Sequence, residues 1–218
     1  MLALSLAVSA AKAKKQVILL DASGLSHAVD LALGMESVIV LDMADVASGE
    51  VSLEAALYPV PNCAGLRLAS ASLYEGTALS ELSGVILALG SMCDILVLDL
   101  PTGNMTLGNG LLRQGDELIY VTRPDDASVR AVERLLRRTG RTDAAESIVV
   151  NRARKDFRKR GIQMDPSAVA MVLDTALLGV IPEDDALALG VRPGHLPGGI
   201  GPAFSEISRI ATQLLNRA

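Results

Sequence analysis

Aromatic residues are nearly absent from this chain of 218 residues. They make up 2% of it, with no tryptophan, although half of the residues are hydrophobic. The core must therefore be built from leucine, valine, isoleucine and alanine. This composition favours sheets covered by helices over β-sandwiches, whose cores use more aromatic side chains.

Cysteine and histidine are also scarce: the full set is Cys63, Cys93, His27 and His195. Their spacing matches no zinc motif, so we expect no zinc site. Two thiols in a chain of this length indicate a reducing compartment, and we interpret both as small packing residues. Imidazole can act as a catalytic base, but we interpret His27 as an incidental surface residue.

The chain has neither an excess of positive charge nor a basic region at its start. Its formal net charge is −5 and its pI is near 5.1, which argues against general binding of nucleic acids. The apolar stretch Met1–Ala11 is followed by lysines instead of being preceded by them, and it is too short to span a bilayer. We therefore expect a buried helix of a cytoplasmic protein here, and no signal peptide.

Apolar runs typical of buried strands alternate with helical patterns along the chain. Strands are predicted over residues 16–20, 66–69, 94–103, 117–122, 147–150 and 177–181. Helices are predicted over 2–14, 43–47, 52–57, 79–89, 104–113, 126–138, 166–174 and from 204 to the end, with Ser52 as one N-cap. The alternation predicts an α/β fold, a mainly parallel sheet with helices on both faces, in a single domain over residues 1–218.

The run Asp94–Gly103 (DILVLDLPTG) carries one carboxylate within an apolar stretch. It predicts a strand buried on both faces with Asp99 near its carboxyl end, where open α/β sheets place their ligands. A carboxylate there needs a partner. A hydrated Mg²⁺ on a nucleotide would serve, and so would the first turn of the next helix, which Asp99 would cap. This stretch alone leaves both interpretations open.

Polar residues end three further predicted strands. Asp21 ends the strand at 16–20, and if that strand neighbours the one at 94–103, Asp21 and Asp99 project into one crevice. Paired acids at strand ends suit the binding of a nucleotide with Mg²⁺. Asn151-Arg152 and Pro182-Glu183-Asp184 end the other two strands and suit contact with a base.

Segments at these positions resemble those of one protein family. They read ILLDA at 18–22, ILVLDLPTG at 95–103, GDELIYVTRPD at 115–125, VRAVER at 129–134, IVVNR at 148–152 and LLGVIPED at 177–184. In order and spacing, the chain resembles the MinD/ParA family of deviant P-loop ATPases over nearly its whole length, and most of all its septum site-determining members. The resemblance implies a Rossmann-like three-layer fold, ATP and Mg²⁺ as cofactors, and a switch that positions the division site or another cellular structure.

The resemblance also implies roles for single residues near the metal. Asp99 would hold Mg²⁺ through a water molecule, and Gly103 would let the backbone approach the γ-phosphate. Asp21 would be the switch acid, a weak catalytic candidate that lies beyond the direct ligands of the metal.

On the base side, the resemblance places Asn151 and Arg152 against the adenine ring. Pro182, Glu183 and Asp184 would close the other side of the ring. The segment 125–130 would correspond to the part of the family's fold that responds to the nucleotide state.

The family's phosphate-binding motif, GKGGxGK[ST], does not occur in the 218 residues. In relatives it directly precedes a helix like the one predicted at 2–14, and a central strand precedes the motif. Without its N–H cradle and lysine, we expect ATP binding to be weak or absent and ATP hydrolysis to be inactive. Without that strand, its two neighbours would have unpaired backbone groups.

Three other features depart from the family or stay ambiguous. The switch loop of the family carries two acids two residues apart, and here the positions are Asp21 and Ser23, which would slow hydrolysis. The chain stops at Ala218 without a basic amphipathic helix, so we expect no direct membrane attachment. The basic run Arg152–Arg160 could bind anionic lipid or nucleic acid, but we interpret it as a solvated loop.

Three hypotheses follow. In the first, this is an ATPase of the family whose recorded start lies downstream of the true one, and which forms a homodimer with ATP and acts with an activating or positioning partner protein. In the second, it is a non-hydrolysing adaptor that binds partners through the retained surface. In the third, it is the remnant of a broken gene. We favour the first, because the polar strand ends still match a nucleotide site that an adaptor would have little need to keep.

Overall fold

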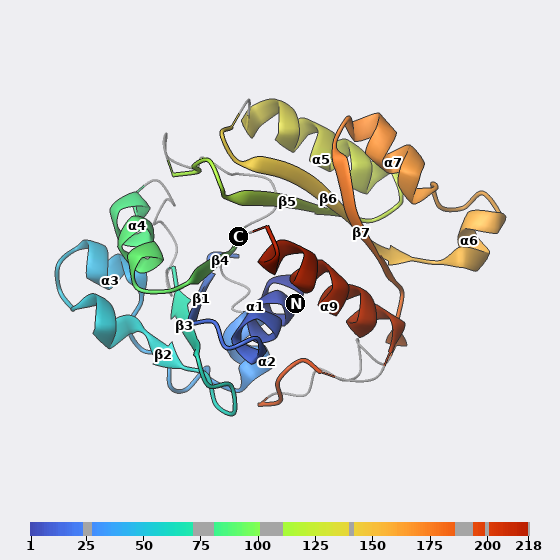
Figure 1. The fold of residues 1–218 in the computed structure, drawn as a ribbon. Coiled ribbons are helices and arrows are strands. Elements are labelled where there is room, and N and C mark those ends of the chain that lie inside the picture. The colour runs from blue at the N-terminus through green and yellow to red at the C-terminus, as the bar shows by residue number, and fades with distance from the viewer. Residues whose placement is uncertain are drawn as a thin grey trace. The chain divides into compact units, whose positions relative to one another are not determined.

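The computed structural model describes residues 1–23, 28–71, 81–100, 111–139, 142–185, 194–198 and 201–217. The chain forms two compact units. One contains residues 1–111 and 189–198, and the other contains residues 112–188 and 199–218. Each unit has its own sheet and its own covering helices (Figure 1).

The sheet of the first unit has four strands in the order β2-β3-β1-β4. Their bounds are Tyr58–Pro59 for β2, Leu66–Ser70 for β3, Val17–Asp21 for β1 and Ile95–Asp99 for β4. β1 lies between β3 and β4, pairs with both in parallel and is buried along its whole length, whereas β2 runs antiparallel at the edge. The helices are Leu2–Lys12 (α1), Ala28–Leu33 (α2), Met43–Ala47 (α3), the 3₁₀ turn Leu53–Ala56 (η1) and Ser83–Ser91 (α4).

The sheet of the second unit has three parallel strands in the order β5-β6-β7. Their bounds are Glu117–Thr122, Ala145–Ala153 and Ala176–Pro182. Helices α5 (Asp126–Thr139) and α7 (Pro166–Leu173) cover one face of this sheet, and α9 (Pro202–Leu215) packs on β7 from the other face (Figure 1). The short helix α6 (Lys155–Lys159) follows β6.

The prediction of an α/β fold with parallel strands covered by helices is confirmed. The N-cap at Ser52 is also confirmed, since its hydroxyl accepts a hydrogen bond from the N–H of Ala55 at 3.4 Å. One prediction is wrong in part: the stretch expected as a solvated loop over 152–160 contains the helix α6, although none of the residues of α6 is buried. The two-residue strand β2 was not predicted. The predicted helix at 104–113 falls largely outside the described residues.

The strand at the centre of the sequence argument differs most from its prediction. All five residues of β4 are half-buried, so the expectation of burial on both faces is wrong. The reason is its place in the sheet: among the described strands, β4 pairs only with β1. In the second unit β5 likewise pairs only with β6. The pattern of side chains along the chain shows how apolar a strand is, but not how many neighbours it has.

The close approach of α9 to β7 yields a stability prediction. A Cβ atom at Gly179 would lie 2.6 Å from Cδ1 and 2.8 Å from Cγ1 of Ile210, so Gly179→Ala should lower the free energy of unfolding by about 1–3 kcal/mol. In α4, a Cβ at Gly84 would meet no atom within 4 Å, so the control Gly84→Ala should leave stability unchanged or raise it by up to about 1 kcal/mol. Urea unfolding of both variants checks this. Equal effects would contradict the packing of α9 on β7.

Candidate functional site

The parallel pairing of β1 with β4 sets two acids side by side. Asp21 is the register partner of Asp99, and the N–H of Ala22 donates to the carbonyl oxygen of Asp99 at 2.9 Å. Side chains of directly paired residues lie on the same face of a sheet. The condition set from the sequence, that the two strands be neighbours, is therefore met.

Asp99 lies in a partly buried setting that disfavours its charge. Burial raises the pKa of its carboxyl group, the positive α-amino group of Met1 opposes that rise, and the negative charge of Asp21 adds to it. The influence of Met1 indicates that the start of α1 lies near this carboxylate. The first turn of α1 contains no acidic residue, and the first N–H groups of a helix attract anions. Two carboxylates beside a helix start can hold a hydrated cation together with an anionic group.

Asp21 is almost fully buried and its oxygens are used by the loop that follows β1. Oδ1 accepts hydrogen bonds from the backbone N–H of Ser23 at 3.0 Å and from its hydroxyl at 2.6 Å. Oδ2 accepts from the N–H of Val29, in the first turn of α2, at 3.3 Å. Asp21 therefore orders the loop and the start of α2, and Ser23, at the position where the family has its second acid, orients the first.

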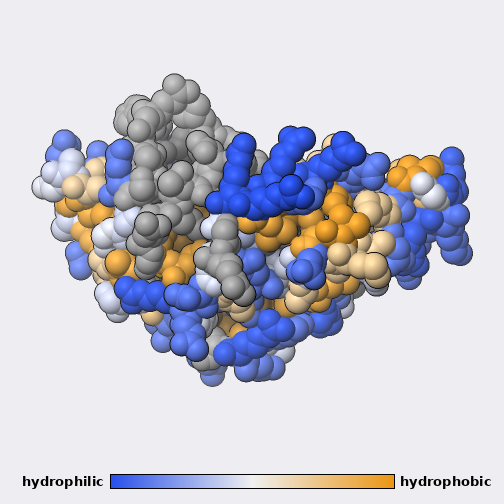
Figure 2. Space-filling model, turned by 90° about the horizontal axis from the view of Figure 1, so that it is seen from above, coloured by the Kyte–Doolittle hydropathy of each residue, from blue (hydrophilic) through white to orange (hydrophobic). Residues whose placement is uncertain are grey.

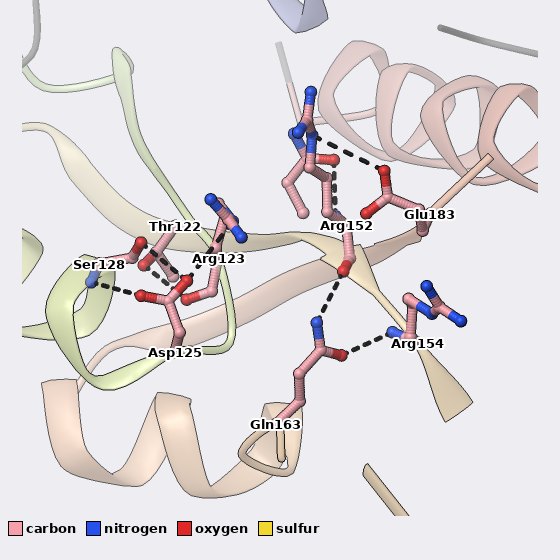
Figure 3. Close-up of polar contacts among 9 residues, drawn as sticks. Thr122, Arg123, Asp125, Ser128, Arg152, Arg154, Gln163 and Glu183 are labelled. Atoms are coloured by element: carbon pink, nitrogen blue, oxygen red, sulfur yellow. Dashed lines mark hydrogen bonds and ion pairs between the residues drawn. The ribbon is translucent and has the colours of Figure 1, made fainter. Parts of the chain in front are cut away.

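In the second unit, Arg152 and Glu183 lie together at the ends of β6 and β7 (Figure 3). The Nε atom of Arg152 is 4.0 Å from Oε1 of Glu183, and both side chains are well exposed. Arg152 has a positive φ of 57°. The backbone N–H of Arg152 donates a hydrogen bond to the side-chain oxygen of Asn151 at 2.9 Å. β7 ends at Pro182, and the N–H of Glu183 donates to the carbonyl of Ala153 at 3.0 Å.

Gln163 fixes this turn, and no pattern in the sequence predicts this role. Its amide nitrogen donates to the carbonyl of Arg152 at 3.2 Å, and its oxygen accepts from the N–H of Arg154 at 2.7 Å (Figure 3). These two bonds bracket Ala153, directly after the left-handed Arg152, and hold the backbone of the turn. The turn that carries Arg152 thus depends on a residue eleven positions away.

Two other acids predicted near the nucleotide cap helices. Oδ2 of Asp184 accepts a hydrogen bond from the N–H of Ala203 at 3.2 Å, at the start of α9. Asp125 accepts from the N–H of Ser128 at 3.0 Å and from its hydroxyl at 3.1 Å. These bonds, assisted by Arg123 at 3.4 Å, lower the pKa of Asp125. Both carboxylates therefore stabilise helix starts in the second unit.

The structure brings the predicted site residues together within each unit: Asp21 with Asp99 in the first, and Asn151, Arg152, Pro182 and Glu183 in the second. Gly103 lies outside the described residues. The described part of the chain contains no cluster of three or more His, Cys, Asp or Glu side chains that could hold a metal, so a cation at Asp21 and Asp99 would depend on water and phosphate for its other ligands. Within the same residues, no helix is long and apolar enough to cross a membrane.

Comparison with known proteins gives consistent results. No family model matches the chain. A putative septum site-determining protein MinD of Emiliania huxleyi is 29% identical over 88% of this chain and 72% of its own length. An uncharacterized ATP-binding protein of Methanocaldococcus jannaschii is also 29% identical, over 97% of this chain and 80% of its own.

Solved structures show the same likeness. The chain matches the MinC:MinD cell division protein complex of Aquifex aeolicus with a TM-score of 0.84 and 25% identity, over 99% of this chain and 89% of the other. It matches the septum site-determining protein MinD of Pyrococcus horikoshii, complexed with Mg-ADP, with a TM-score of 0.77 and 22% identity, over 98% and 88%. The second of these likenesses concerns the fold alone.

The raised pKa of Asp99 yields a prediction with a defined sign. A carboxyl group whose folded-state pKa is raised stabilises the fold below its unfolded pKa and loses that contribution as the pH rises through the folded value. Asp99→Asn should therefore make the protein more stable at neutral pH, by about 0.5–1 kcal/mol because the site is only half-buried, and the gain should shrink toward pH 4. Urea unfolding between pH 4 and pH 7, the range set by the ordinary pKa of Asp, measures it.

Asp21→Asn is the matched control for this experiment. Both carboxylate oxygens of Asp21 accept hydrogen bonds, and in Asp21→Asn one of them would be replaced by an NH₂ group, which cannot accept. We therefore expect Asp21→Asn to lower the free energy of unfolding by about 1–2 kcal/mol at neutral pH. If Asp99→Asn destabilised the protein as Asp21→Asn does, the carboxylate of Asp99 would stabilise the fold. That result would contradict the inference that the charge of Asp99 lowers the stability of the protein without a ligand.

Proposed function

The chain belongs to the MinD/ParA family of ATPases, and we propose on that basis that it is a nucleotide-dependent positioning switch of the cytoplasm. Its task would be the selection of the division site or the placement of another cellular structure. The observation that carries the proposal is the register pairing of Asp21 with Asp99 beside the start of α1.

The residues of the first unit fit a hydrated Mg²⁺ on a nucleotide. Mg²⁺ takes one or two carboxylates and fills its other positions with water and phosphate oxygens, which agrees with two acids and no third ligand among the described residues. In this proposal Asp99 holds the ion through water. Asp21, already bonded to Ser23 and Val29, keeps the adjoining loop in place. When bound, the ion would neutralise phosphate charge.

The residues of the second unit fit the base. In this proposal Arg152 lies over one face of the adenine ring, with Asn151 beside it. Pro182 and Glu183 lie on the other side, and the ion pair between Arg152 and Glu183 sets the width of the site. Asp184 contributes indirectly, because its carboxylate is bonded to the start of α9.

The chain lacks two features that the family uses for ATP hydrolysis. The 218 residues contain no GKGGxGK[ST] motif, and serine occupies the position of the second switch acid. A serine hydroxyl carries no charge with which to orient an attacking water, and here it donates to Asp21. We therefore propose that these residues bind ATP weakly and do not hydrolyse it.

The same two observations favour a second candidate function, that of a non-hydrolysing adaptor. In this alternative the chain binds a partner protein through its surface, as MinD of Aquifex aeolicus does in its complex with MinC. The adaptor needs no nucleotide, and this separates the two candidates by experiment.

Saturation-transfer NMR with Mg-ATP tests the nucleotide site, because it detects weak binding. We expect transfer to the adenine protons with a dissociation constant of about 1 mM or weaker, since the 218 residues contain no GKGGxGK[ST] motif to bind the phosphates tightly. Arg152→Ala should abolish most of this transfer. Arg160→Ala, a change of equal charge at the end of α6, should leave it intact. An absence of transfer in the unaltered protein would favour the adaptor, and equal loss in both variants would point to a mere effect of charge.

A further inference from the structure

Acidic and basic residues are segregated along this chain. Between residues 16 and 66 there are seven acidic residues and no lysine or arginine. Helix α5 has the opposite character, with four arginines against two acids. The acidic segment belongs to the first unit and α5 to the second, so the two units carry segments of opposite charge. A net charge of −5 conceals this division.

The acidic segment also exposes apolar side chains. Val38 is 53% and Val40 68% exposed, in the stretch between α2 and α3. The hydroxyl group of Tyr58 holds this stretch: it accepts from the N–H of Val40 at 3.1 Å and of Leu41 at 2.8 Å. A partner that binds here would cover these two exposed valines. We define the acidic surface as these two valines with the exposed acids of the same segment, Glu36, Glu50 and Glu54.

A second apolar surface lies on α7, whose eight residues carry no charge. Met171 is 80% and Val172 55% exposed, although a helix that is apolar all round is normally buried. Helix α5 packs against α7, and seen from above, hydrophilic side chains over α5 border hydrophobic ones over α7 (Figure 2).

Two arginines of α5 are available to a partner. Arg130 and Arg134 are exposed and make no hydrogen bond or ion pair with any other described residue. Arg137 pairs with Glu133 at 2.6 Å, but both lie at the solvent-exposed surface, where such a pair contributes little. We define the basic surface as Met171 and Val172 with Arg130 and Arg134.

We propose that the acidic surface of one copy of this chain binds the basic surface of a second copy. One surface has exposed apolar residues with glutamates and the other has them with two arginines that bond no described residue, so a second copy supplies both complements. An anionic membrane or a nucleic acid fits less well, because the exposed Asp174 directly follows α7 and the chain as a whole is negative.

Two different surfaces meet in this contact. A pair that makes the contact twice satisfies both surfaces, and so does a chain of copies that makes it once between neighbours. With only a few apolar side chains on each side, the interface belongs to the small, transient class of less than about 1,200 Å². It requires no nucleotide, so it stands or falls independently of the proposed function.

Sedimentation velocity without nucleotide tests this association. We expect the weight-average mass to rise steadily from micromolar to several hundred micromolar protein in dilute salt. At 1 M salt the rise should largely disappear, because the screening length falls from about 10 Å at 0.1 M to about 3 Å. A protein that remains monomeric throughout, or whose association is unchanged at 1 M salt, would overturn the proposal.

Two variants that each break one surface give the sharper result. Val38→Ser with Val40→Ser, and Met171→Ser with Val172→Ser, should each be monomeric alone, and their mixture should form a one-to-one dimer and nothing larger, because one intact surface of each kind remains. Leu87→Ser, on the exposed side of α4, should associate like the unaltered protein. A mixture that stays monomeric, or a control that fails to associate, would contradict the assignment of the two surfaces.

Discussion

The parallel pairing of β1 with both of its neighbours is the constraint on which the first unit depends. β1 is completely buried, and its register with β4 determines that Asp21 and Asp99 end at the same level. A slip of one residue would turn every side chain of β4 to the opposite face and separate the two acids. The burial that fixes the register also makes the charge of Asp99 unfavourable, and a positive ligand beside it would relieve that cost.

Much of this arrangement could be predicted from local patterns. An apolar run that ends in a carboxylate is a local feature, so the strands, their polar ends and the cap at Ser52 could be identified from the residues themselves. The neighbours of a strand are not local, and for this reason the half-exposure of β4 and the division into two sheets were missed. Gln163 was missed for the same reason, since the groups it bonds lie nine and eleven residues away.

Several acids that look alike in the sequence differ in the structure by what satisfies them. Asp125 and Asp184 are bonded to backbone N–H groups at helix starts, which stabilises their charge. Asp99 has burial and a neighbouring carboxylate against it, opposed only by the amino group of Met1. Within one chain, the environment thus distinguishes the acids that cap helices from Asp99, the candidate for binding a ligand. Residue type alone could not separate them.

The position of β4 at the side of its sheet divides its own backbone into two sets. The N–H of Ile95 donates to Gln16 and the carbonyl of Asp99 accepts from Ala22, so the odd-numbered residues of β4 face β1. The even-numbered Leu96 and Leu98 then face away, where none of the described strands pairs with β4. In heavy water the two sets would separate: the amides turned toward β1 keep their hydrogens for as long as the sheet stays closed, whereas those of Leu96 and Leu98 exchange with the solvent wherever it reaches that edge. The exchange rates of the amides along β4 would thereby show, residue by residue, which side of the strand is paired with β1.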